Sequence, residues 1–136
     1  MQNLFSHFTH KQVASAFQQS KCINYFCIIP KYERQLREHQ ARGEWKDSWD
    51  IKINPEHRIE GYSFYLIGCP IARHAKEHGY EELLPYLCKT DHALAHILHA
   101  KLIRTQIESL GGEYCDYWYV GDKSAAAKEF SDIEEI

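Results

Sequence analysis

The sequence predicts an α+β fold, in which two β-hairpins form one antiparallel sheet and helices pack on one face of it. Helical patterns occupy residues 9–41 and 70–99, whereas strand patterns occupy residues 49–67 and 101–120. The resulting order of helices, hairpin, helices and hairpin is typical of an α+β layer, because both hairpins can join the same sheet.

The composition is that of one small domain. The chain has 136 residues, of which 44% are hydrophobic, so it can bury one core but not two. We expect a single domain over residues 1–121 and an acidic C-terminal tail over residues 122–136. The net charge of −3 and the absence of a long Lys/Arg run provide no electrostatic basis for binding nucleic acid or an anionic membrane.

Neither a signal peptide nor a membrane span is predicted. Residues 1–20 lack the apolar core of a signal peptide. The apolar run at residues 22–30 is far shorter than the roughly 20 residues that span a bilayer. We therefore expect a cytoplasmic protein, in which the five cysteines remain thiols rather than disulfides.

The first half of the chain is predicted to be largely helical. Thr9 is a suitable N-cap for a helix over residues 9–20, which has apolar residues at helical spacing. The apolar segment 22–29 fits either a buried helix or a strand, and periodicity does not decide between them. Pro30 suits the first turn of a further helix over residues 30–41, and Gly43 is a natural stop.

A hairpin and a helix follow. Trp49, Ile51 and Ile53 alternate with polar residues, which predicts a half-buried strand, and residues 61–67 form the strand that pairs with it. Pro70 suits the first turn of a helix that ends at the next glycine. Cys69 is thus expected at a strand-to-helix junction, where unpaired backbone N–H groups favour a thiolate.

The second half repeats this order. We expect a short helix over residues 81–88 and a separate helix over residues 90–99, whose apolar centre is Leu94, Ile97 and Leu98. The last hairpin has strands at residues 101–107 and 114–120 and a double-glycine turn between them. From residue 122 onward, the sequence predicts a frayed helix or disorder.

Three cysteines fall in different predicted elements of this half. Eighteen residues separate Cys69 from Cys88, and twenty-six separate Cys88 from Cys115. These intervals are too long for a local metal-binding knuckle, so only the fold could bring the thiols together. Asp91 lies three residues after Cys88 and Asp116 is next to Cys115, which suggests a site of thiols and carboxylates.

These cysteines also stand in motifs that resemble a known family. Residues 69–73 read Cys-Pro-Ile-Ala-Arg, residues 87–91 read Leu-Cys-Lys-Thr-Asp, and residues 111–117 read Gly-Gly-Glu-Tyr-Cys-Asp-Tyr. In order and spacing they resemble the L-2-amino-thiazoline-4-carboxylic acid hydrolase family, over residues 49–121. The element order also resembles vinyl-reductase-type ligand-binding domains, an analogy that informs fold more than function.

The resemblance implies a hydrolase that opens a cyclic C–N bond in a small heterocycle. Cys69 would be the nucleophile or a ligand and Cys115 the second choice, because a thiolate attacks an sp² carbon between two heteroatoms well. Asp91 or Asp116 would serve as acid and base. A metal-bound water held by the same cysteines would do this work by another route, and the sequence leaves both routes open.

Other readings of these residues remain open. Cys115 also fits a small buried hydrophobe, and it shares one strand face with Tyr117 whereas Asp116 points to the other face. Cys88 fits packing on a Leu-rich helix, and Asp91 fits helix capping. Arg104, predicted mid-strand, would either clamp a substrate carboxylate or lie on an exposed polar face.

The histidines give weaker signals. His78 is the one we would consider as a base in a substrate-binding site, and it pairs with His74 at helical spacing. His92, His96 and His99 form a stripe that could hold a metal, although we expect it to face water. No cofactor is therefore predicted.

A second hypothesis makes the chain a non-catalytic small-molecule-binding or adaptor domain on the same scaffold. Its aromatic residues would suit a ligand pocket or a face between two copies of the chain, although most of them also fit the core of the sheet. These aromatic residues are Tyr62, Phe64, Tyr65, Tyr117, Trp118 and Tyr119.

Overall fold

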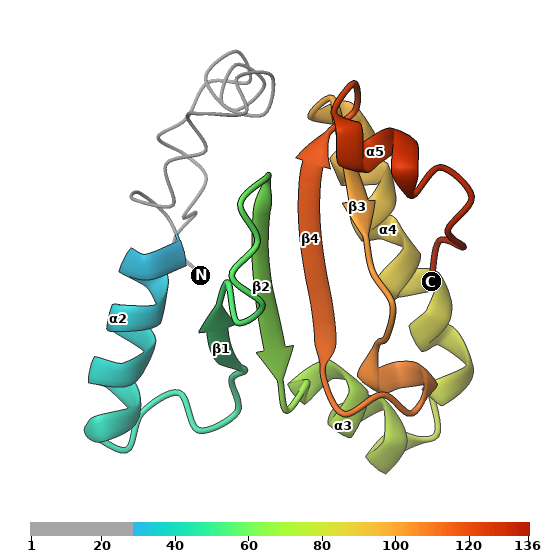
Figure 1. Ribbon diagram of the computed structural model, residues 1–136. Coiled ribbons are helices and arrows are strands. Elements are labelled where there is room, and N and C mark those ends of the chain that lie inside the picture. The colour runs from blue at the N-terminus through green and yellow to red at the C-terminus, as the bar shows by residue number, and fades with distance from the viewer. Residues whose placement is uncertain (1–28) are drawn as a thin grey trace.

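The computed structural model describes residues 29–136 (Figure 1). The helix predicted over residues 9–20 and nearly all of segment 22–29 lie outside this range. The elements are α2 (Ile29–Ala41), β1 (Asp50–Ile53), β2 (Tyr62–Ile67), α3 (Pro70–His78), the 3₁₀ turn η1 (Glu81–Leu83), α4 (Leu84–Ile97), β3 (Ala100–Ile103), the 3₁₀ turn η2 (Glu108–Leu110), β4 (Cys115–Gly121) and α5 (Ala125–Glu129).

The four strands form one antiparallel sheet in the order β1-β2-β4-β3. The predicted hairpin pairs Ile51 with Leu66, and β2 continues to β4 by pairing Phe64 with Tyr117. Figure 1 shows α2 beside the edge strand β1, and α4 beside the other edge strand, β3. The predicted α+β class is confirmed. The strand predicted over residues 101–107 is shorter, because the chain leaves β3 after Ile103.

The turn before β2 packs tightly on the sheet. Gly61 has φ of +75°, and a Cβ atom added there would lie 2.3 Å from the carbonyl oxygen of Tyr119. Glycine is needed here for two reasons. Residues with a side chain rarely adopt this positive φ, and a Cβ atom would collide with the backbone of β4. The neighbouring carbonyl of Glu60 accepts a hydrogen bond from the Trp118 indole at 2.8 Å. These contacts fix the loop against β4.

The helix after β2 begins and ends as predicted. Cys69 is its N-cap, Pro70 occupies its first position, and Gly79 ends it in the left-handed conformation at φ of +74°. The Cys69 thiol accepts a hydrogen bond from the Ala72 N–H at 3.4 Å. Local sequence therefore positions this sulfur at the end of the central strand β2.

The helix predicted to break near residue 89 is continuous. Thr90 does not cap a new helix; its hydroxyl donates to the Leu87 carbonyl within α4. The predicted apolar centre was also wrong, because Leu94 and Ile97 are half-exposed. Tyr117 and Tyr119 fill the sheet face under this part of α4, so the side chain that fits against them is the smaller Ala95.

Two faces of the sheet are covered by different helices. On one face α4 packs its inward residues over β3 and β4. On the other face Ala126 and Ala127 of α5 pack against Trp118 and Val120. The segment after residue 122, for which a frayed helix or disorder was predicted, therefore includes a packed helix, capped by the Ser124 hydroxyl.

Most of the aromatic side chains of β2 and β4 pack against one another on the sheet. Phe64 and Tyr117, paired across β2 and β4, stack with their ring centres 4.9 Å apart and nearly parallel. Tyr65 stacks on Tyr114 on the opposite face. Such cross-strand pairs stabilise a sheet and account for these aromatic residues as core.

Candidate functional site

One side of α4 carries several of the predicted site residues toward the sheet. Cys88, Asp91, His92 and Ala95 recur at helical spacing, and each is buried or partly buried. Beneath them, Cys115 and Tyr117 of β4 point to the same face of the sheet because they are two residues apart. Arg104, just after β3, continues the alternation of the buried Leu102 on this face.

The turn η2 connects the three cysteines of the described chain. The Glu108 carboxylate accepts hydrogen bonds from the backbone N–H groups of Gly68 at 2.6 Å and Cys69 at 2.9 Å. The Glu108 N–H lies 3.4 Å from the Cys115 sulfur and donates to it. The Ser109 hydroxyl lies 3.4 Å from the Cys88 sulfur. We call Cys69, Cys88 and Cys115 the thiol cluster.

The members of the thiol cluster differ in environment. Cys115 is buried, and burial raises the pKa of its thiol to about 11. The hydrogen bond from the Glu108 N–H lowers this pKa, while the charges of Cys69, Glu108 and Cys88 raise it by smaller amounts. It is thus protonated near neutral pH. Cys69 is partly exposed and sits at the start of α3, with its sulfur facing a backbone N–H. Of the two thiols, Cys69 is therefore the more accessible to a small molecule.

A buried arginine forms the second half of the site. Arg104 is 1% exposed, so it is neither mid-strand nor on an exposed polar face. Its Nη1 donates to Asp91 Oδ2 at 3.1 Å, and its Nη2 donates to the Cys88 carbonyl at 2.9 Å. The Tyr117 hydroxyl donates to the same Asp91 oxygen at 2.9 Å. We call Arg104, Asp91 and Tyr117 the Arg104 cluster.

Tyr117 links the Arg104 cluster to the thiol cluster. Burial, and then the charge of Asp91, raise the pKa of Tyr117, so its hydroxyl stays a proton donor. The Arg104 guanidinium lies 5.3 Å from the centre of the Tyr117 ring. Cys115 precedes Tyr117 by two residues, which along a strand is about 7 Å.

Two predicted site residues lie apart from these clusters. Asp116 points to the opposite face from Cys115, as strand alternation requires, and accepts hydrogen bonds from the Thr105 N–H, the Thr105 hydroxyl and the Gln106 N–H. Its contacts hold the chain after β3. His78 is exposed on α3, and its Nδ1 contacts the His74 carbonyl at 2.9 Å.

Sequence reasoning missed Glu108 and the environment of His92. Glu108 reaches residues some forty positions earlier in the chain, and only the close approach of η2 to the end of β2 creates these contacts. His92 was expected to face water, but it is 3% exposed because it lies on the inward side of α4. Burial lowers the pKa of His92, and its Nε2 contacts the main-chain oxygen of Ile136 at 3.1 Å.

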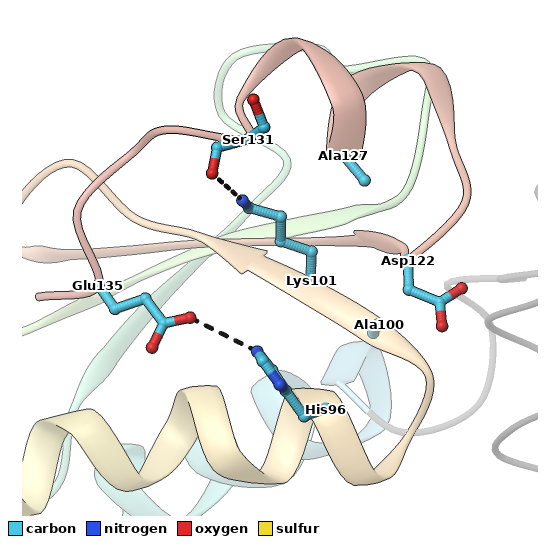
Figure 2. A pocket seen from close by; sticks show the side chains of 7 residues that line it. All are labelled: His96, Ala100, Lys101, Asp122, Ala127, Ser131 and Glu135. Atoms are coloured by element: carbon cyan, nitrogen blue, oxygen red, sulfur yellow. Dashed lines mark hydrogen bonds and ion pairs between the residues drawn. The ribbon is translucent and has the colours of Figure 1, made fainter.

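A cavity of about 360 Å³ lies near the far end of α4. Figure 2 shows that it is bordered by α4, β3, α5 and the segment after α5. Lys101 donates to the Ser131 carbonyl at 3.2 Å, and His96 pairs with Glu135 at 3.5 Å. The thiol cluster does not line this cavity. Its lining residues are His96, Ala100, Lys101, Asp122, Ala127, Ser131 and Glu135.

Among residues 29–136, no three His, Cys, Asp or Glu side chains are grouped so that they could hold a metal ion. Every helix in the same range is too short or too polar to cross a bilayer.

The sequence model of the L-2-amino-thiazoline-4-carboxylic acid hydrolase family matches residues 3–119. The chain belongs to this family. The match includes the first half of the chain as well as the three cysteine motifs. No curated protein and no solved structure matches the chain significantly, so the likeness to vinyl-reductase-type domains stays an expectation.

The three cysteine motifs lie in three different elements of the fold. The Cys69 motif starts α3, the Cys88 motif ends at Asp91 on the inward side of α4, and the Cys115 motif opens β4. The structure thus gathers the sulfur atoms of all three motifs around η2, and the carboxylate of the second motif holds Arg104.

Proposed function

We propose that this protein hydrolyses a small cyclic amidine that carries a carboxylate, as the family name suggests. The observation that carries the proposal is the position of the thiol cluster beside the Arg104 cluster on one face of the sheet. A thiol can attack the ring carbon, and a buried guanidinium can bind the carboxylate. These are the two functions that such a substrate requires.

In the proposed reaction, the Cys69 thiolate adds to the ring carbon that lies between nitrogen and sulfur. The ring C–N bond then breaks, and the ring nitrogen takes a proton and leaves as an amine. Water next adds to the same carbon and expels the Cys69 thiolate, which leaves a carbamoyl product. The sum is one water consumed and one C–N bond cleaved.

Glu108 is the carboxylate that we assign to proton transfer. Its Oε2 accepts a hydrogen bond from the backbone N–H of Cys69 and its Oε1 from that of Gly68, so the carboxylate is held beside the proposed nucleophile. Asp91, by contrast, already accepts from Arg104 and Tyr117. We therefore assign Asp91 to positioning the guanidinium, and Asp116 on the opposite face has no step in this scheme.

The test is turnover of L-2-amino-thiazoline-4-carboxylate by the purified full chain, followed as carbamoyl-cysteine. Cys69→Ser should lower the rate at least about 1000-fold, because a hydroxyl is a far weaker nucleophile near neutral pH. Lys76→Ala, an exposed change on the same helix, is the matched control. Glu108→Gln should lower the rate less, by about 100-fold.

Two results would contradict the proposal. Full turnover after alkylation of Cys69 would exclude the covalent route. No turnover by the unmodified protein, together with binding of the substrate, would instead favour the ligand-binding hypothesis.

A further inference from the structure

The outward side of η1 and α4 carries an apolar stripe, and no segment among residues 29–136 covers it. Its members follow one another at intervals of four, three, four and three residues, so they share one side of the helix. Leu87 is 50% exposed and Ile97 is 59% exposed, although both are large and apolar. A contiguous exposed patch of this kind is typical of a surface that another molecule covers. The members of the stripe are Leu83, Leu87, Thr90, Leu94 and Ile97.

The core of the domain does not use the stripe. On the inward side of α4, Leu84 and Ala95 are buried, and Ala95 packs with Leu102 of β3. Thr90, the polar member of the stripe, already donates its hydroxyl to the Leu87 carbonyl, so it can enter an apolar contact with that hydrogen bond intact. A helix that is apolar on both sides is typical of one that is covered on both sides.

The size of the stripe suits a weak interface between two molecules. With Tyr86, which lies on its flank and is 75% exposed, the stripe presents roughly 500 Å² of apolar surface, the upper range for the largest patch on a monomer. Two such stripes in contact would bury roughly 1,000 Å², which is close to the lower limit for a specific interface. The expected Kd is therefore micromolar, about 1–100 µM.

The spacing of the stripe matches itself when the helix is turned end for end. Alternating intervals of three and four residues form the seam of a two-helix coiled coil, where the side chains of one helix fit between those of the other. An antiparallel two-fold axis near position 88 sets Leu83 opposite Leu94 of a second copy. The same axis sets Leu87 opposite Thr90, a larger side chain against a smaller one. The stripe is thus complementary to itself, as a two-fold contact requires.

The flank of the stripe fits the same axis. Tyr86 would lie opposite Ala93 of the second copy, so the large ring has room beside a methyl group. In a parallel pair each residue would meet its own counterpart, and the two copies of Tyr86 would compete for one space. Charged side chains on the outward side lie beyond this flank, which keeps charge out of the contact. They are Glu82, Lys89 and His96.

We propose that the chain forms a homodimer in which the α4 stripes of two copies pack antiparallel. The proposal does not depend on the proposed function, because the inward side of α4, with Cys88 and Asp91, takes no part in the contact. Each stripe residue is used twice in a two-fold contact, so one substitution alters two places in each dimer. A charge in the stripe should weaken the dimer and leave the monomer folded, because the substituted side chains are already half-exposed.

The experiment is sedimentation equilibrium of the full chain between about 5 and 500 µM, which brackets the expected Kd. Ile97→Arg should weaken dimerisation at least about 30-fold, because two isoleucines lose their contact and two charges are desolvated. Ile59→Arg is the matched control. It makes the same change at a fully exposed isoleucine before β2 and should leave the dimer unchanged. Thermal unfolding at the lowest concentration checks that both variants fold.

A charge exchange tests the antiparallel orientation. Leu83→Lys and Leu94→Glu should each weaken the dimer at least about tenfold, because each introduced charge meets an uncharged leucine. Together in one chain they should restore the affinity to within about tenfold of the unmodified protein, because each introduced lysine then faces an introduced glutamate of the other copy. The two positions lie about 16 Å apart along one helix, too far for a pair within the chain. In a parallel dimer like charges would meet, and the double change would weaken binding further.

Selective loss with Ile97→Arg and recovery in the charge exchange would support the proposal. A chain that stays monomeric up to about 500 µM would overturn it and assign the stripe to another occupant. A dimer that Ile97→Arg leaves intact, or that Ile59→Arg weakens equally, would overturn it as well. Weakening by both single changes without recovery in the double change would refute the antiparallel orientation.

Discussion

Removing the Asp91 carboxylate should destabilise the protein through the arginine that it holds. Asp91→Ala leaves Arg104, which is 1% exposed, without its anionic partner, and it deprives the Tyr117 hydroxyl of its acceptor. Loss of one partner from a buried ion pair costs about 3–5 kcal/mol. Because Asp91 is one-third exposed, water can partly replace it, and we expect about 2–3 kcal/mol.

The matched control is the ion pair between Asp47 and Arg73, which is shorter at 2.8 Å but has side chains that are 87% and 48% exposed. Asp47→Ala should cost less than about 1 kcal/mol. The assay is urea unfolding of each variant, with the midpoint compared at constant slope. If Asp91→Ala and Asp47→Ala destabilised the protein equally, the role assigned to the buried guanidinium would be wrong.

Three further predictions concern the thiols, the buried histidine and the loop before β2. Iodoacetamide at about pH 8 should modify Cys69 well before Cys115, whose pKa burial raises to about 11; equal rates by peptide mapping would contradict the assigned environments. Burial lowers the pKa of His92 in the folded state, so its contribution to stability is present above the unfolded value of about 6.5 and is lost as pH falls below it. His92→Gln should flatten this part of the stability–pH curve, and an unchanged curve would refute the point. Gly61→Ala should cost more than about 3 kcal/mol because its Cβ meets backbone at 2.3 Å, whereas Gly79→Ala, with open space, should cost only about 1–2 kcal/mol of conformational strain; similar losses in thermal unfolding would contradict the difference.

Local sequence signals predicted much of the fold. Alternation around Ile51, and the aromatic strand that pairs with it, identified the first hairpin, while Pro70 and Gly79 identified the bounds of α3. These features depend on neighbours in the chain, so the sequence displays them directly. The family motifs likewise singled out Cys69, whose place at the start of α3 follows from the same local pattern.

The errors arose where distant residues decide the outcome. The inward side of α4 was misassigned because Leu94 is more apolar than Ala95, yet the tyrosines of β4 leave space only for the smaller side chain. In the sequence, Arg104 resembled a residue on an exposed strand face, because its partners Asp91 and Ile136 are distant along the chain. Glu108 gave no local signal at all, since its partners belong to the end of β2.

The continuity of α4 has a mechanical consequence. Cys88, Asp91, His92 and His96 belong to a single unbroken helix. They contact Ser109, Arg104, the main-chain oxygen of Ile136 and Glu135 in turn. A continuous helix moves as one body, so a molecule that binds beneath α4 near His96 also shifts the Cys88 sulfur nearer its start. The reactivity of Cys88 toward a small alkylating reagent therefore provides a readout of events about two helical turns away.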